Sequence, residues 1–225
     1  MSSYVIQCRS SRAVPLAMIE AFARAMTARD ESTHEHAQRV RRFALALAEE
    51  AGIDDERMLE AIEAAALLHD IGKLGIPDRL LNKPGPLTPD EFDQVKQHVV
   101  IGADILRAVP VPSPLALIVR HHHENWDGTG YPDGLEGEAI PVGARVLSIV
   151  DCYDALTSDR PYRLALSHGS AIAMIHERRG TMYEPAIVDA FLRIVQRLRS
   201  GSDRERAGRP QARTHGPWRL QARAV

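Results

Sequence analysis

The sequence has few of the residues that stabilise small secreted domains or membrane proteins. Only two cysteines, Cys8 and Cys152, occur in 225 residues, too few for a disulfide framework or a four-cysteine zinc site. No stretch reaches the eighteen or so uninterrupted apolar residues of a membrane-spanning helix. The N-terminal residues also lack the apolar run of a secretory signal. We therefore expect a soluble cytoplasmic protein with no membrane insertion.

Aromatic residues are also scarce, at 5% of the chain, and the formal net charge is only −2. Such a balance of charge gives no general affinity for polyanions, so we expect no DNA or RNA polymer as a partner. Apolar residues still make up 44% of the chain, which is enough for the core of one domain.

Many Ala and Leu residues, few β-branched runs and apolar residues at steps of three to four predict an all-α fold. Thr88 and Glu91 have the spacing of a capping box, which predicts that a helix begins there and carries Phe92, Val95 and His98 on one face. The other helices are expected before residue 30 and at about 34–51, 55–70, 114–123, 142–158, 168–178 and 184–199.

This pattern divides the chain into three parts. We expect an N-terminal helical extension at residues 1–29, one helical domain at 30–198, and a disordered Arg-rich tail at 199–225. The tail has no apolar periodicity, so it cannot bury enough surface to offset its ordering entropy. It is either a solvated extension or a segment whose arginines bind an acidic partner or nucleic acid, with Trp218 as an anchor.

Several polar residues lie on the apolar faces of these predicted helices. An unpaired imidazole or carboxylate in such a place would cost several kcal/mol of desolvation. One such histidine is usually a hydrogen-bonded core residue, but six groups on five helices can satisfy one another by converging on bound cations. These inward-facing groups are His36, His69, His98, His122, Asp151 and Asp154.

Imidazoles with carboxylates and no thiolate are typical ligands of Fe, Mn, Co or Zn. Asp70, next to His69, could bridge two ions, and two ions about 3.5–4 Å apart clamp a phosphoryl group and activate water. Lys73 follows closely and has two interpretations. It either contacts phosphate oxygens or is a lysine favoured by a helix C-terminus. The composition of the site predicts a metal-dependent hydrolase.

Four segments of the sequence together resemble the HD-GYP domain, a branch of the HD-type metal phosphohydrolases. They are HDIGKLGIPDRLLNKPGPLT, the single His98, HHENWDGTGYP and DCYDALTSDRPYR, and the resemblance covers about residues 29–197. It implies an all-α bundle with a bi- or trinuclear site, often of iron or manganese. The implied activity is hydrolysis of the bacterial messenger cyclic di-GMP to the linear dinucleotide pGpG or to GMP.

The resemblance assigns roles residue by residue. It implies that Asp70 bridges the metals, that Lys73 contacts phosphate, and that His121 is not a ligand. Asp154 could orient a ligand from behind. The implied metal ligands are His36, His69, Asp70, His98, His122, His123 and Asp151. Gly130, Tyr131 and Pro132 would form a loop beside the substrate, and Arg160 and Arg163 would meet phosphate or guanine.

One position departs from the family pattern. Members with three metals have a Glu four residues before the N-terminal histidine, and this chain has Ser32 there. We therefore expect two divalent ions per chain, iron or manganese, with a third only if another carboxylate or the substrate compensates. Members without this Glu favour stopping at the linear dinucleotide, so pGpG and GMP both remain open as end products.

Three other functions compete with this one. The first is a non-catalytic receptor that binds cyclic di-GMP or metal and acts through a protein partner. The second keeps the chemistry but acts on another cyclic dinucleotide, because fold and metals do not fix base recognition. The third is a helical bundle with a structural metal, which leaves Lys73 and the Gly130–Pro132 loop unexplained. A regulatory partner, or a homodimer formed through the first helix, is compatible with the pattern.

Overall fold

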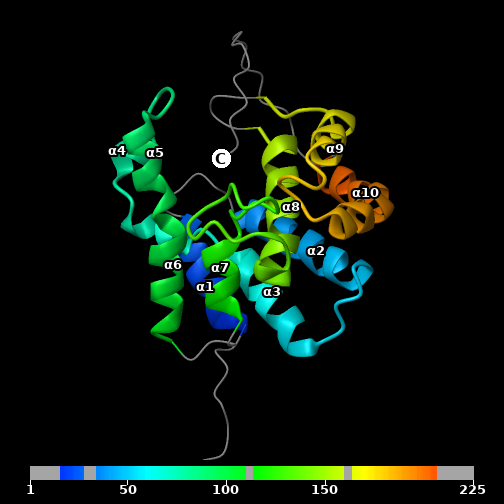
Figure 1. Ribbon diagram of the computed structural model, residues 1–225, viewed down its shortest axis with the longest axis horizontal. Coiled ribbons are helices and arrows are strands. Elements are labelled where there is room, and N and C mark those ends of the chain that lie inside the picture. The colour runs from blue at the N-terminus through cyan, green and yellow to red at the C-terminus, as the bar shows by residue number, and fades with distance from the viewer. Residues whose placement is uncertain (1–15, 28–33, 110–113, 160–163, 207–225) are drawn as a thin grey trace, which may run out of the picture.

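The computed structural model describes residues 16–27, 34–109, 114–159 and 164–206 of the chain (Figure 1). Within these residues every named element is a helix, and two isolated β-bridges are the only strand-like pairings. The all-α prediction is confirmed. The α-helices are α1 (Leu16–Thr27), α2 (His34–Glu50), α3 (Glu56–Leu68), α4 (Asp78–Leu81), α5 (Pro89–Lys96), α6 (His98–Arg107), α7 (Leu115–His121), α8 (Val142–Thr157), α9 (His168–Glu177) and α10 (Pro185–Arg206). Two 3₁₀ helices, η1 (Ile71–Gly75) and η2 (Gly137–Ala139), complete the set.

Short polar side chains fix where several helices begin. The Asp55 carboxylate accepts the Met58 N–H at the start of α3, and the Ser167 hydroxyl accepts the Ser170 N–H at the start of α9. The capping box predicted at Thr88 is present, with both reciprocal hydrogen bonds to Glu91. These bonds satisfy N–H groups that a helix cannot pair within its own first turn.

The core forms where α2 packs against α3 and α8, with α10 lying across α2 (Figure 1). Val40, Leu47, Ile62 and Leu147 are fully buried there. Helix α1 packs mainly on α3 and contributes Ile19 and Ala23 to the same core, so the predicted N-terminal extension is attached to the bundle through its helix. Helices α6 and α7 pack on each other. Helix α7 also packs on α3 and α8, and α6 packs on η1.

Two expectations about helix limits need correction. The helix predicted after Thr88 is divided at Gln97 into α5 and α6, because the Gln97 N–H bonds to Gln94 and Val95 in a tight turn and α6 then begins at His98. The predicted disordered tail was placed at 199–225, yet α10 continues to Arg206. Extending an existing helix adds one hydrogen bond for each residue fixed, so elongation is far easier than starting a new helix. Residues 207–225, including Trp218, lie outside the described residues.

No helix in the described ranges is both long and apolar enough to cross a membrane.

Candidate metal centre

Three helices bring together a first group of candidate ligands, His36, His69 and Asp151, which we call the His36 trio. His36 lies in the first turn of α2, His69 is the C-cap of α3, and Asp151 lies in the middle of α8. One Asp151 carboxylate oxygen is 3.4 Å from His36 Nε2 and 3.7 Å from His69 Nε2. One cation could contact all three side chains, whose ligand atoms lie within 4.8 Å of one another.

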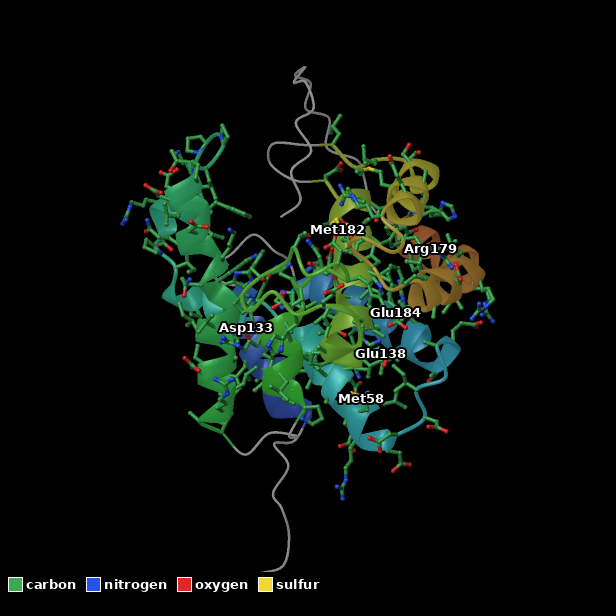
Figure 2. The ribbon with its side chains drawn as sticks, viewed as in Figure 1. Met58, Asp133, Glu138, Arg179, Met182 and Glu184 are labelled. Carbon is green, nitrogen blue, oxygen red and sulfur yellow. The ribbon has the colours of Figure 1, made fainter. Side chains whose placement is uncertain are left out.

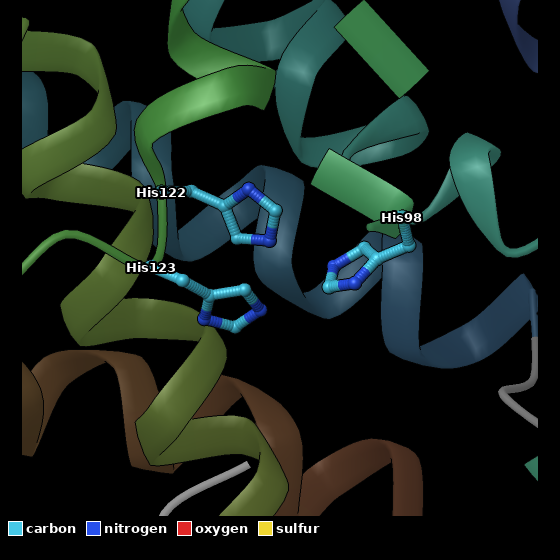
Figure 3. Close-up of side chains that lie close together, drawn as sticks. All are labelled: His98, His122 and His123. Atoms are coloured by element: carbon cyan, nitrogen blue, oxygen red, sulfur yellow. The ribbon is translucent and has the colours of Figure 1, made fainter. Parts of the chain in front are cut away.

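A second group, His98, His122 and His123, consists only of imidazoles, and we call it the His98 trio. His98 begins α6, while His122 and His123 follow the last residue of α7. Figure 3 shows the three rings pointing into one shared space. The His122 and His123 ring centroids are 4.0 Å apart, and the His98 centroid is 5.2 Å from that of His123.

Asp70 lies between the two trios. One of its carboxylate oxygens is 3.5 Å from His69 Nε2 and the other is 3.8 Å from His98 Nε2. The ammonium of Lys73 is 2.8 Å from the Asp70 oxygen that faces His69. A carboxylate with one oxygen toward each trio is the arrangement expected of a ligand shared by two ions.

A close backbone approach fixes the distance between these groups. A Cβ atom at Gly72 would lie 1.8 Å from the His98 carbonyl oxygen, so only glycine allows η1 to lie this close to α6. Because Gly72 lies between Asp70 and Lys73 in the sequence, the same contact places both side chains beside His98.

Hydrogen bonds fix the orientation of three histidine rings. The Nδ1–H groups of His69, His98 and His122 donate to the carbonyl oxygens of Ala66, Val95 and Val119, at 3.2, 2.8 and 2.8 Å. The Nε2 atoms of the same rings are buried and lack a hydrogen-bond partner among the described residues. Buried polar atoms are rarely left unpaired. Orphaned Nε2 atoms that face carboxylates therefore fit a bound divalent cation, the environment in which a neutral imidazole is a good ligand.

The protonation states also suit metal binding. Burial, together with the charges of neighbouring histidines, holds the pKa values of His122 and His123 well below the usual range, and burial lowers the pKa of His98. For Asp70, burial acts to raise the pKa, but the charges of Lys73, His69 and His98 outweigh it and keep the pKa well below its ordinary value. Neutral imidazoles and ionised carboxylates are the forms that bind metals.

His36 differs from the other histidines because its Nδ1 lies 2.7 Å from an oxygen of Asp154, which is 1% exposed. Burial lowers the pKa of His36, yet the hydrogen bond to Asp154 and the charge of Asp151 produce a net rise. Burial raises the pKa of Asp154, but its hydrogen bonds with His36 and Arg39 bring it to about 2. This contact supports the expectation that Asp154 orients a ligand, because Asp154 bonds to the ring of the candidate ligand His36.

The Gly130–Pro132 loop lies beside the His98 trio. The Glu124 carboxylate accepts the Asp133 and Leu135 N–H groups, and a Cβ at Gly130 would lie 2.2 Å from the Asn125 nitrogen. The Tyr131 ring is 5.0 Å from the His123 ring, and a cis peptide bond joins Tyr131 to Pro132. The loop therefore covers the His98 trio with an aromatic ring.

Other predicted residues lie apart from the trios or outside the described residues. His121, the last residue of α7, contacts the Asp133 carboxylate at 2.9 Å, and Arg120 also binds Asp133. Figure 2 shows Asp133 beside α7. Arg160, Arg163 and Ser32 fall in the segments that are not described. Sequence reasoning missed Arg39, although its position three residues after His36 puts both side chains on one face of α2.

Comparison with known proteins places the chain in a family. A family model described as "HD domain" matches residues 20–187. The cyclic di-GMP phosphodiesterase response regulator RpfG of Xanthomonas campestris is 45% identical over 176 residues, which cover 76% of this chain and 46% of that protein. A cyclic di-GMP phosphodiesterase of Thermotoga maritima is 42% identical, with 79% and 49% covered. The chain thus spans about half the length of these relatives.

A solved structure shares the fold. The cyclic GMP-AMP specific phosphodiesterase V-cGAP3 of Vibrio cholerae matches with a TM-score of 0.65 at 20% identity, over 84% of this chain and 52% of that one. Family model, relatives and fold agree with the resemblance found in the sequence. This chain belongs to the HD domain family, and its sequence places it with the HD-GYP branch.

Proposed function

We propose that this chain is a metal-dependent phosphodiesterase that hydrolyses cyclic di-GMP to pGpG, to GMP or to both. The observation that carries the proposal is one carboxylate, Asp70, with an oxygen toward each of two ligand trios and Lys73 beside it. The names of two relatives at 42–45% identity supply the substrate.

The proposed metal content is two divalent ions, iron or manganese. The His36 trio would hold one ion, the His98 trio the other, and Asp70 would contact both. Bound ions supply positive charge that polarises a phosphoryl group and makes water a nucleophile at neutral pH. The all-nitrogen and oxygen donor set, with no cysteine among the trios, supports these metals over a structural zinc of the cysteine type.

Two side chains of the site would contact the substrate directly. The Lys73 side chain is 22% exposed, so its ammonium can turn partly away from Asp70 and donate to a phosphate oxygen of the entering dinucleotide. Burial, and then the charges of Asp70 and Asp151, raise the pKa of Tyr131, so its hydroxyl stays protonated at neutral pH and can donate a hydrogen bond. Gly130 and Pro132 hold this ring in place, and Arg160 and Arg163 are proposed to meet the second phosphate or a guanine.

The test is a turnover assay on anaerobically purified protein, reconstituted separately with Fe(II) and Mn(II). Cyclic di-GMP and 3′3′-cGAMP are offered in parallel, products are resolved by chromatography, and bound metal is counted in the same samples. We expect pGpG or GMP from cyclic di-GMP with about two ions per chain. His176→Ala, which removes an exposed histidine of α9, serves as a control that keeps full activity.

Two results would contradict the proposal. Tight binding of cyclic di-GMP without product would favour the receptor function. Product formed by protein that holds no metal would exclude a metal-dependent reaction altogether.

A further inference from the structure

His36 is oriented by different means from three other histidines of the two trios. His69, in the same trio, and His98 and His122, in the other trio, donate Nδ1–H to backbone carbonyl oxygens three residues earlier in the chain, so the backbone sets the orientation of these rings. His36 lies in the first turn of α2 and its Nδ1 bonds to a side chain from a different helix, the Asp154 carboxylate of α8. The orientation of His36 therefore depends on what holds Asp154.

Arg39 donates a hydrogen bond to each oxygen of this carboxylate. Its Nε donates to one Asp154 oxygen at 2.5 Å and an Nη donates to the other at 2.9 Å. The same Nη donates to the Ser158 hydroxyl at 3.1 Å. A fork of two parallel donors fixes the plane of a carboxylate, which a single donor cannot do.

Helices α2 and α8 are linked through two side chains of each helix. On α2, His36 and Arg39 are one turn apart, and on α8 Asp151 and Asp154 are one turn apart. His36 Nε2 faces Asp151 at 3.4 Å while its Nδ1 faces Asp154 at 2.7 Å. One carboxylate of α8 thus belongs to the His36 trio, and the other holds the back of the ring that completes it.

We infer that Arg39 is a positioning residue that acts through Asp154 on His36 and sets the metal affinity of the His36 trio but not of the His98 trio. The inference rests on the proposed function in that His36 must be a ligand. Arg39 donates to both oxygens of the Asp154 carboxylate, and its effect on His36 passes through that carboxylate. Loss of a group that orients a ligand from behind typically weakens metal binding by about 10–100-fold.

The first experiment measures the affinity of each of the two ions by Mn(II) titration of metal-free protein in competition with a chromophoric chelator. In Arg39→Gln we expect one ion to bind about 10–100-fold more weakly and the other to be unchanged. Arg39→Lys keeps the charge without the fork, so we expect an intermediate loss. Thermal unfolding of the metal-free variants reports their structural effect separately.

Arg145→Gln is the matched control. Arg145 lies on α8, the helix of Asp154, and forms an ion pair with Glu184; its side chain is 14% exposed, compared with 17% for Arg39 on α2. This variant loses a half-buried ion pair without touching Asp154, so both ion affinities should stay within about twofold of the parent protein.

The second experiment is a double-mutant cycle with Asp154→Asn. If Arg39 acts through Asp154, adding Arg39→Gln to Asp154→Asn should change the affinity of the weakened ion by less than about twofold, because the two residues are then one coupled unit. Additive losses would overturn the inference. So would equal weakening of both ions, or a lower melting temperature of Arg39→Gln with unchanged affinities.

A separate variant distinguishes this inference from the proposed function. If His36→Ala leaves both ion affinities unchanged, His36 is not a ligand and the assignment of the His36 trio fails. If His36→Ala weakens one ion while Arg39→Gln weakens neither, the ligand assignment stands and the role of Arg39 is excluded. Neither result depends on turnover.

Discussion

The His36 trio and the His98 trio differ in both composition and origin. The His36 trio has a carboxylate, Asp151, and a histidine backed by a second carboxylate, whereas the His98 trio has three imidazoles. Oxygen donors favour harder cations such as Mn(II), and imidazoles suit Fe, Zn and Cu. The comparison predicts that the two halves of the centre differ in metal preference and affinity.

The two trios are also assembled over different distances along the chain. The His98 trio comes from α6 and the end of α7, which pack on each other and are joined by a short connection. The His36 trio needs side chains from α2, α3 and α8. His36 and Asp154, the carboxylate that contacts its ring from behind, are 118 residues apart in the sequence. Local folding can bring the His98 trio together, but the His36 trio exists only when the whole bundle has packed.

The largest expected effect comes from the residue that the two trios share. Asp70→Ala removes the carboxylate between them and leaves Lys73 beside two sets of histidines, so we expect both ions to bind weakly and turnover to fall about 10³-fold or more. Steady-state kinetics and metal counting measure this. Asp93→Ala, which removes an exposed carboxylate of α5, is the control, and retained turnover in Asp70→Ala would contradict the shared role.

Single ligand variants should separate the two halves. His36→Ala and His123→Ala are each expected to lower the bound metal from two ions to about one per chain, because each leaves the other trio intact. Elemental analysis gives the count, and Mn(II) resonance spectra of the remaining ion should differ between the variants. Identical spectra, or loss of both ions from either variant, would show that the trios do not act as separate sites.

A smaller effect is expected when the spacing of the trios is disturbed. In Gly72→Ala the new methyl group meets the His98 carbonyl oxygen, so η1 must move away from α6. Overpacking of this kind costs about 1–3 kcal/mol of folding free energy. Chemical denaturation measures it, and metal binding should weaken in both trios. Gly169→Ala, at an open position in α9, should not destabilise the protein.

The smallest effect is expected at the ring that covers the His98 trio. Tyr131→Phe keeps the aromatic contact with His123 and removes only the hydroxyl, so metal affinity should change by less than about threefold. Any loss should be in turnover or substrate affinity, measured by steady-state kinetics. Tyr131→Ala also removes the ring and should weaken the binding of the ion held by the His98 trio. Equal metal affinities in both variants would exclude a packing role.

Most of the candidate ligands could be predicted from the sequence because they lie at a helical step from apolar residues, whereas His123 followed only from the resemblance to the HD-GYP domain. His69, for example, continues the apolar face of α3, and the structure buries it at 3% exposure. Helix limits were harder to predict. The turn at Gln97 and the continuation of α10 to Arg206 depend on local hydrogen bonds that leave little trace in an apolar pattern.

Residues that contact the candidate ligands from behind were only partly predictable. Asp154 follows Asp151 by one turn of a helix, so the sequence could place it near the site. Arg39 shares a face of α2 with His36, but this spacing alone does not indicate that its side chain contacts Asp154 of α8. The role of Gly72 was not predictable either, because its close approach to the His98 carbonyl depends on how η1 packs against α6.

The helical class, the chemical nature of the candidate ligand set and the family followed from the sequence alone, because periodicity and motif spacing are local properties of the chain. The three-dimensional packing was needed to show that six candidate ligands form two trios, that Asp70 faces both, and that Asp154 with Arg39 contacts His36 from behind. These contacts join helices far apart in the chain, and their geometry follows from how side chains of α2, α3 and α8 pack together in the core.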